Sequence, residues 1–112
     1  MIENILPKNF MVSAKPVSFI CSKNDVRKEV KNNTLNLYDL LCSNDFEEQI
    51  QVVESLESWL KTCFPNKMFC SYFLYSNEMD SKFCFHIEYP NMDWISNEKV
   101  KTSDKCIRKN TF

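Results

Sequence analysis

Apolar residues recur at steps of three and four between Asn44 and Phe64, which is the strongest pattern in the chain. This spacing places them along one side of a helix of about five turns. They are Phe46, Ile50, Val53, Leu56, Trp59, Leu60 and Cys63. Asn44 is suited to cap the first turn, with Glu47 three residues later, and Pro65 cannot continue the helix. The pattern therefore predicts an amphipathic helix over residues 44–64.

Two segments after this helix, Met68–Tyr75 and Lys82–Tyr89, are rich in aromatic residues and have the length of β-strands. The residues between them predict a hairpin in which Ser76 pairs with Ser81. In that register one face is almost wholly apolar and consists of Met68, Cys70, Tyr72, Leu74, Phe83, Phe85, Ile87 and Tyr89. The other face is mixed and consists of Phe69, Ser71, Phe73, Tyr75, Lys82, Cys84, His86 and Glu88. We expect the apolar face to pack on the long helix, although a slip of one residue would exchange the faces.

The patterns before the helix are weaker. Residues 1–10 predict a loose lead-in, and alternating apolar and polar residues predict a strand over 11–21. Residues 22–25 are a turn candidate. Residues 26–31 fit either a helix or a strand, and we favour a second short strand that completes a hairpin with the first.

Residues 35–42 are apolar enough for one buried helix of about two turns, with a strand as the alternative. Residues 91–100 suggest a short helix, and the basic segment 101–112 is expected to fray. Together the elements predict one α+β domain over residues 11–100. It has an antiparallel sheet, the long helix packed on one face, and the order β-β-α-α-β-β.

Composition limits the class of protein. The chain has 112 residues, enough for one domain, with 44% apolar and 26% charged residues. Its mean hydropathy is −0.38, and no apolar run approaches the roughly 20 residues that a membrane span needs. The first ten residues contain an early acid and no long apolar stretch, so we expect no secretory signal and a cytoplasmic or nuclear location.

The cysteines have long, irregular spacings and include no Cys-x-x-Cys. They are Cys21, Cys42, Cys63, Cys70, Cys84 and Cys106. We expect reduced thiols of an intracellular protein.

Glycine is absent from the chain, and arginine and alanine are rare. The absence of glycine excludes the glycine-based phosphate loops and the dinucleotide-binding fingerprint. The residues used instead, such as lysine and asparagine, suggest AT-rich coding DNA.

Three cysteines and the single histidine are of the types that bind zinc. They are Cys63, Cys70, Cys84 and His86. In the predicted register Cys70 points to the opposite face from Cys84 and His86, so these groups do not converge. We therefore expect no metal and no cofactor.

Catalysis has no support in the pattern. Cys84 and His86 share one strand face at a separation of roughly 7 Å, which is too far for direct proton transfer. The carboxylate pairs Glu47–Glu48 and Glu54–Glu57 are predicted on the solvated outer face of the helix. We expect the protein not to be an enzyme.

The mixed face of the hairpin is either covered by other parts of the chain or a recognition surface. Because 13% of the residues are aromatic, we expect part of this apolar surface to need a partner. The candidate partner-binding residues are Phe69, Phe73, Tyr75, Lys82 and His86.

The sequence thus predicts a non-enzymatic protein–protein interaction module. It would be an adaptor subunit of an intracellular complex or a small viral protein that engages a host factor. Its partner would be another protein or a second copy of itself, and not a membrane. The alternative is binding of single-stranded RNA through the aromatic sheet face, against which stands the net charge of −1.

Overall fold

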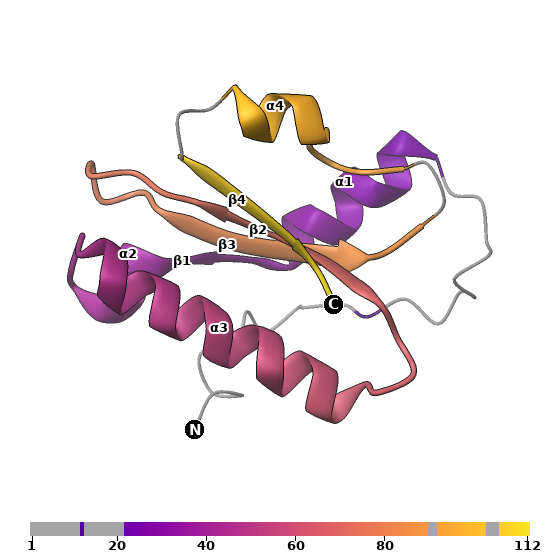
Figure 1. The fold of residues 1–112 in the computed structure, drawn as a ribbon, viewed down its shortest axis with the longest axis horizontal. Helices are drawn as coiled ribbons and strands as arrows, with labels where there is room; N and C mark the ends of the chain where they lie inside the picture. Colours follow the sequence, from indigo (N-terminus) through magenta and orange to yellow (C-terminus); the bar gives the residue numbers. More distant parts are fainter. Residues whose placement is uncertain (1–11, 13–21, 90–91, 103–105) are drawn as a thin grey trace.

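The computed structural model describes residues 12, 22–89, 92–102 and 106–112. In these residues four antiparallel strands form one sheet, with helices on both of its faces (Figure 1). The helices are α1 Lys23–Asn32, α2 Leu37–Leu41, α3 Phe46–Cys63 and α4 Asn97–Lys101. The strands are β1 Thr34–Asn36, β2 Phe69–Leu74, β3 Lys82–Ile87 and β4 Ile107–Thr111, in the sheet order β1-β3-β2-β4. The predicted α+β class is confirmed.

Helix α3 agrees with the predicted amphipathic helix to within two residues. Its cap is Asp45 and not Asn44, because the Asp45 carboxylate accepts the backbone N–H of Glu48 at 3.0 Å. The helix lies across one face of the sheet (Figure 1) and buries Val53, Leu56 and Leu60 there. Full burial of such side chains stabilises the fold by about 1.5–3 kcal/mol each.

The hairpin of β2 and β3 forms as predicted, but its register differs by one residue. Leu74 is the partner of Lys82, whereas the predicted pairing of Ser76 with Ser81 requires a shift of one position. The reason is that a side chain closes the loop. Ser81 Oγ donates to the Ser76 carbonyl at 2.7 Å and accepts its backbone N–H at 2.8 Å. Met79 provides the left-handed residue of this loop, with φ of 68°, in a chain without glycine.

The register decides which side chains share a face. One face, toward α3, carries Phe69, Ser71, Phe73, Phe83, Phe85 and Ile87. The other face carries Cys70, Tyr72, Leu74, Lys82, Cys84 and His86. The prediction that Cys70 faces away from Cys84 and His86 is therefore wrong.

Helix α1 replaces the strand that was predicted for residues 26–31. A capping box starts this helix: Ser22 Oγ accepts the N–H of Asp25 at 3.2 Å, and Asp25 Oδ2 accepts the N–H of Ser22 at 3.1 Å. Val26 and Val30 are then buried on one side of α1. The competing helical spacing of these two valines was the correct interpretation.

The order of elements also differs from the prediction. The described elements run α1-β1-α2-α3-β2-β3-α4-β4 and not β-β-α-α-β-β. The lead-in over 1–10 and nearly all of the strand over 11–21 lie outside the described residues. In residues 35–42 both alternatives occur in part, since β1 ends at Asn36 and α2 follows it directly.

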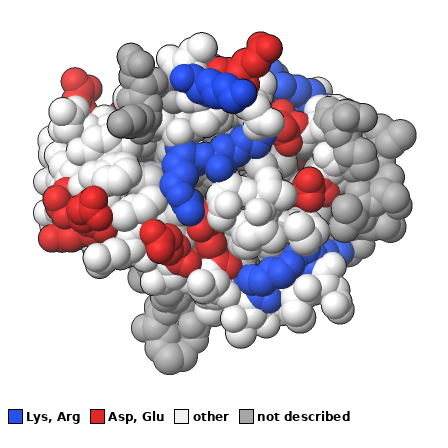
Figure 2. All heavy atoms as spheres, viewed as in Figure 1, with Lys and Arg blue, Asp and Glu red and all other residues white. Residues whose placement is uncertain are grey.

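Strand β4 lies in the segment that was expected to fray, so that prediction is wrong for residues 107–111. The basic residues there are ion-paired: Arg108 contacts Glu57 at 3.0 Å, and Lys109 contacts Asp93 at 2.6 Å. Figure 2 shows lysine and arginine side chains that cross β4, beside acidic side chains of α3. Pairing with β2 and with these acids fixes the end of the chain.

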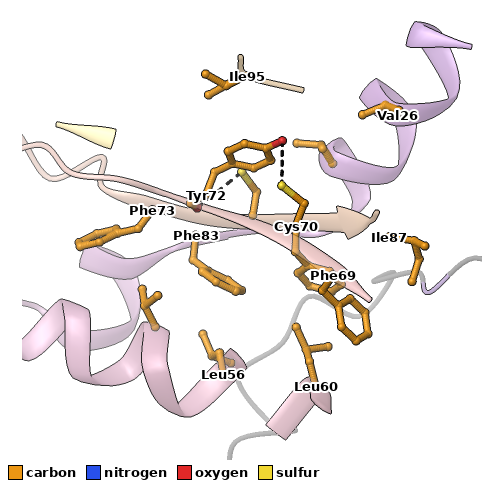
Figure 3. Packing of buried hydrophobic residues seen from close by; sticks show 14 of the residues in the cluster. Val26, Leu56, Leu60, Phe69, Cys70, Tyr72, Phe73, Phe83, Ile87 and Ile95 are labelled. Carbon is orange, nitrogen blue, oxygen red and sulfur yellow. Dashed lines mark hydrogen bonds between the residues drawn. The ribbon is translucent and has the colours of Figure 1, made fainter. Parts of the chain in front are cut away.

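The core has a layer on each side of the sheet (Figure 3). Between the sheet and α3 lie Leu56, Leu60, Phe69, Phe73 and Phe83. On the opposite side lie Val26, Cys70, Tyr72 and Ile95. The second layer covers the face that brings the thiol and imidazole groups together.

The cysteines of the described residues are free thiols, as predicted. Cys42, Cys63 and Cys106 are exposed, whereas Cys70 and Cys84 are buried. None of the helices in the described part of the chain is long and apolar enough to cross a membrane.

Candidate functional site

The five residues predicted to bind a partner do not form one surface. Phe69 and Phe73 are 0% and 1% exposed and pack toward α3. Tyr75 is half-buried, Lys82 is exposed, and His86 is fully buried on the opposite face. Partner binding by these residues stays a prediction, but the exposed aromatic surface on which it depended is part of the core.

A buried hydrogen-bonded relay occupies the sheet face away from α3. Tyr72 Oη lies 2.9 Å from His86 Nε2 and 3.3 Å from Cys70 Sγ. The backbone N–H of Trp94 donates to the same hydroxyl at 3.0 Å. His86 Nδ1 lies 2.6 Å from the Ile87 carbonyl. Since a carbonyl only accepts, Nδ1 carries the proton, and Nε2 offers its lone pair to the Tyr72 hydroxyl.

Burial keeps the members of this relay uncharged. It raises the pKa of the Cys70 thiol and of the Tyr72 hydroxyl, and it lowers the pKa of the His86 imidazole. The neighbouring Cys84 thiol has its pKa raised to about 12, again mainly by burial. A thiol that stays protonated is a poor nucleophile, so this face offers no activated cysteine.

Asp93 extends the relay toward solvent. One potential ligand atom each from Cys70, His86 and Asp93 lies within 4.8 Å of the other two. The Asp93 carboxylate accepts from Lys109 Nζ at 2.6 Å, and Lys109 also donates to Asn97 Oδ1 at 2.7 Å. The Asp93 side chain is 40% exposed, whereas that of Lys109 is 8% exposed. Thiol, imidazole and carboxylate are the groups with which proteins bind transition metals.

Side chains of α1 and the residue after it close one edge of the sheet. Beyond the short β1, the Glu29 carboxylate accepts the backbone N–H of Ile87 at 2.5 Å and the hydroxyl of Tyr89 at 2.7 Å. Asn33 Nδ2 donates to the Phe85 carbonyl at 3.3 Å. Both polar side chains are buried and take the places of a neighbouring strand.

The opposite edge is the outer side of β4. Phe69 and Phe112 exchange both backbone hydrogen bonds, at 2.7 and 3.0 Å, and the N–H of Tyr75 donates to the Cys106 carbonyl. In an antiparallel pair such bonds involve every second residue. The backbone groups that point away from β2 therefore belong to Ile107, Lys109 and Thr111. In the described residues no further strand pairs with them.

Glu57 holds β4 against α3. Its carboxylate accepts from Ser71 Oγ at 2.5 Å and from two nitrogens of Arg108, at 3.0 and 3.3 Å. The prediction that Glu57 lies on the solvated face of the helix is wrong, because these two partners draw it under β4. The Arg108 side chain is more exposed than that of Glu57, so the pair lies at the rim of the core.

No single feature of the sequence indicates these polar groups. Glu29 follows Val26 by three positions, so a helical assignment would have placed it on the buried side. Asp93 lies near Cys70 and His86 because of how distant parts of the chain pack together, and no local spacing in the sequence indicates this proximity. No family model, curated protein or solved structure significantly matches this chain.

Proposed function

We propose that this chain is a non-enzymatic protein–protein interaction module that binds an extended segment of another protein along the outer edge of β4. The observation that carries the proposal is the alternation of backbone bonds in β4. Ile107, Lys109 and Thr111 direct their N–H and carbonyl groups away from β2. A peptide that adds a strand to such an edge gains main-chain hydrogen bonds without any rearrangement of the sheet.

The two edges of the sheet differ in a way that supports this site. At the β3 edge, Glu29 and Asn33 bond the backbone groups that β1 does not reach. Among the described residues β4 has no such side-chain cover. Proteins commonly block sheet edges that are not used for pairing, so an edge left open beside a blocked one marks a place for a partner.

Charge favours a partner segment with acidic side chains. Lys99 and Lys101 are exposed on α4, which packs beside β4. The basic side chains of β4, Arg108 and Lys109, are already paired with Glu57 and Asp93, so this preference comes from α4. A second copy is a poorer occupant, because a two-fold pairing of β4 strands about Lys109 would place two lysines opposite each other.

RNA binding through the sheet face loses support from the same structure. Two of its proposed stacking residues, Phe69 and Phe73, are covered by the α3 layer. Base stacking needs exposed rings. An edge-binding module would act as an adaptor subunit of an intracellular complex or as a small viral protein that engages a host factor.

The test is affinity capture from cells with three forms of the protein, with and without nuclease. Thr111→Pro removes one outward N–H, and proline is tolerated at a sheet edge. Thr111→Val keeps that N–H and the branched side chain, so it is the matched control. We expect a nuclease-resistant protein partner that wild type and Thr111→Val retain and Thr111→Pro loses, with circular dichroism unchanged. Equal capture by Thr111→Pro, or loss of all partners with nuclease, would contradict the proposal.

A further inference from the structure

We infer that Cys70, His86 and Asp93 form a binding site for a divalent transition metal of the zinc type. The site is separate from the β4 edge proposed above and holds the segment before α4 against the sheet. It combines one thiol, one imidazole and one carboxylate, whose ligand atoms lie within 4.8 Å of one another. A thiolate ligand favours zinc and similar soft ions over calcium or magnesium.

The strands place two of the ligands without loop adjustment. Cys70 and His86 are direct partners in the register of β2 and β3, so their side chains leave the same face side by side. Asp93 approaches from the segment between β3 and α4. Ligand atoms around a tetrahedral zinc lie roughly 3.5 Å apart, so closure requires movements of about 1 Å.

The tautomer of His86 suits metal binding. Its Nδ1–H donates to the Ile87 carbonyl, so Nε2 is the nitrogen with the lone pair, which accepts the Tyr72 hydroxyl until a metal replaces it. Metal-binding histidines commonly have their second ring nitrogen fixed in this way by a carbonyl or carboxylate. Tyr72 Oη is hydrogen-bonded to Nε2 at 2.9 Å and to Cys70 Sγ at 3.3 Å, and both hydrogen bonds are replaced when the metal binds.

The charges balance in the loaded site. Binding replaces the Cys70 thiol proton, which leaves to solvent, so that a thiolate and the Asp93 carboxylate neutralise a divalent ion. Cys70 and His86 are buried, and the partly exposed Asp93 provides the route of entry. In the metal-free site Lys109 Nζ donates to Asp93 Oδ2, so the lysine competes with the metal for this oxygen. When the metal binds, Lys109 keeps its hydrogen bond to Asn97 Oδ1.

The test uses cobalt(II) as the probe, because a cobalt–thiolate bond gives a charge-transfer absorption. We expect one equivalent of Co²⁺ to produce this band in chelator-treated wild-type protein and Zn²⁺ to displace it. Cys70→Ser should abolish the band, whereas Cys63→Ser, at an exposed thiol on α3, should leave it unchanged.

Two further variants change the partly exposed Asp93 carboxylate and its ion-pair partner Lys109. Asp93→Asn should weaken Co²⁺ binding by at least roughly 10- to 100-fold. Removal of a group that only supports a metal ligand already has an effect of this size, and Asp93 is itself a proposed ligand. Lys109→Gln should strengthen it by about two- to fivefold, since it frees the carboxylate from an ion pair. A wild-type protein without the band, a band that survives Cys70→Ser, or weaker binding in Lys109→Gln would overturn the inference.

Discussion

Glu29 accepts the backbone N–H of Ile87 at 2.5 Å, so a carboxylate from the first helix closes an edge of the central sheet. The same carboxylate accepts the hydroxyl of Tyr89. Glu29 is 3% exposed, which removes water as a substitute acceptor. One buried side chain therefore joins α1 to β3 and to the residues that follow it.

Removal of this acceptor should destabilise the protein markedly. Glu29→Ala leaves two buried donors without their partner, at about 1–3 kcal/mol for each. The free energy of unfolding, measured with urea, checks this expectation. Glu47→Ala, at an exposed acid of α3, is the control and should change stability by less than about 0.5 kcal/mol. Equal effects in the two variants would show that Glu29 is not the cap of the edge.

Glu57 and Arg108 should contribute unequally to stability. Glu57→Ala removes the acceptor of the buried Ser71 hydroxyl as well as the ion pair, whereas Arg108→Ala removes the ion pair alone. Because the Arg108 side chain is 36% exposed, solvent screening limits the pair to about 0.2–1 kcal/mol. A double-mutant cycle measures this coupling, and a larger loss in Arg108→Ala than in Glu57→Ala would contradict the geometry.

Some elements of the fold could be predicted from the sequence and others could not. The α3 stripe and the two aromatic strands were predictable, because each rests on local periodicity. The hairpin register was not, since the Ser81 side chain closes the loop and shifts the pairing by one residue. In the observed register Phe69 and Phe73 are buried and Cys70 lies beside His86, neither of which the predicted register implied.

Long-range pairing accounts for the other differences. Strand β4 is short and basic, and its order comes from β2 and from ion pairs with residues far away in the chain. No local pattern indicates such pairing. The fold class was therefore predictable, whereas the sheet edges and the Cys70–His86–Asp93 cluster needed the three-dimensional register.

The cysteines should fall into two classes of reactivity. Burial raises the pKa of Cys70 and Cys84, so little thiolate forms at pH 8, and both groups are shielded. Cys42, Cys63 and Cys106 are exposed. Brief alkylation of the metal-free native protein, read by mass spectrometry of peptides, should label the exposed thiols first. Labelling of Cys84 at the rate of Cys63 would show that the sheet face is open.

Stability of the metal-free protein should depend on pH through His86. Burial lowers the pKa of the folded imidazole below the ordinary value of 6.5. Below pH 6.5 the imidazole of the unfolded chain therefore binds a proton, whereas the buried imidazole of the folded protein stays neutral. The contribution of neutral His86 to the free energy of unfolding is complete above pH 6.5 and is lost as the pH falls toward the folded pKa. Urea unfolding between pH 8 and pH 5 should show a steeper loss in wild type than in His86→Gln. Parallel curves would mean that the imidazole is solvated.

Amide hydrogen exchange along β4, resolved residue by residue by NMR, tests the open edge most directly. The inward N–H groups of Arg108 and Asn110 should exchange slowly, whereas the outward N–H groups of Lys109 and Thr111 should exchange fast in the free protein. On addition of the captured partner, the outward amides should become protected as well. Uniform slow exchange along β4 in the free protein would show that this edge is already covered, and would contradict the proposed mode of binding.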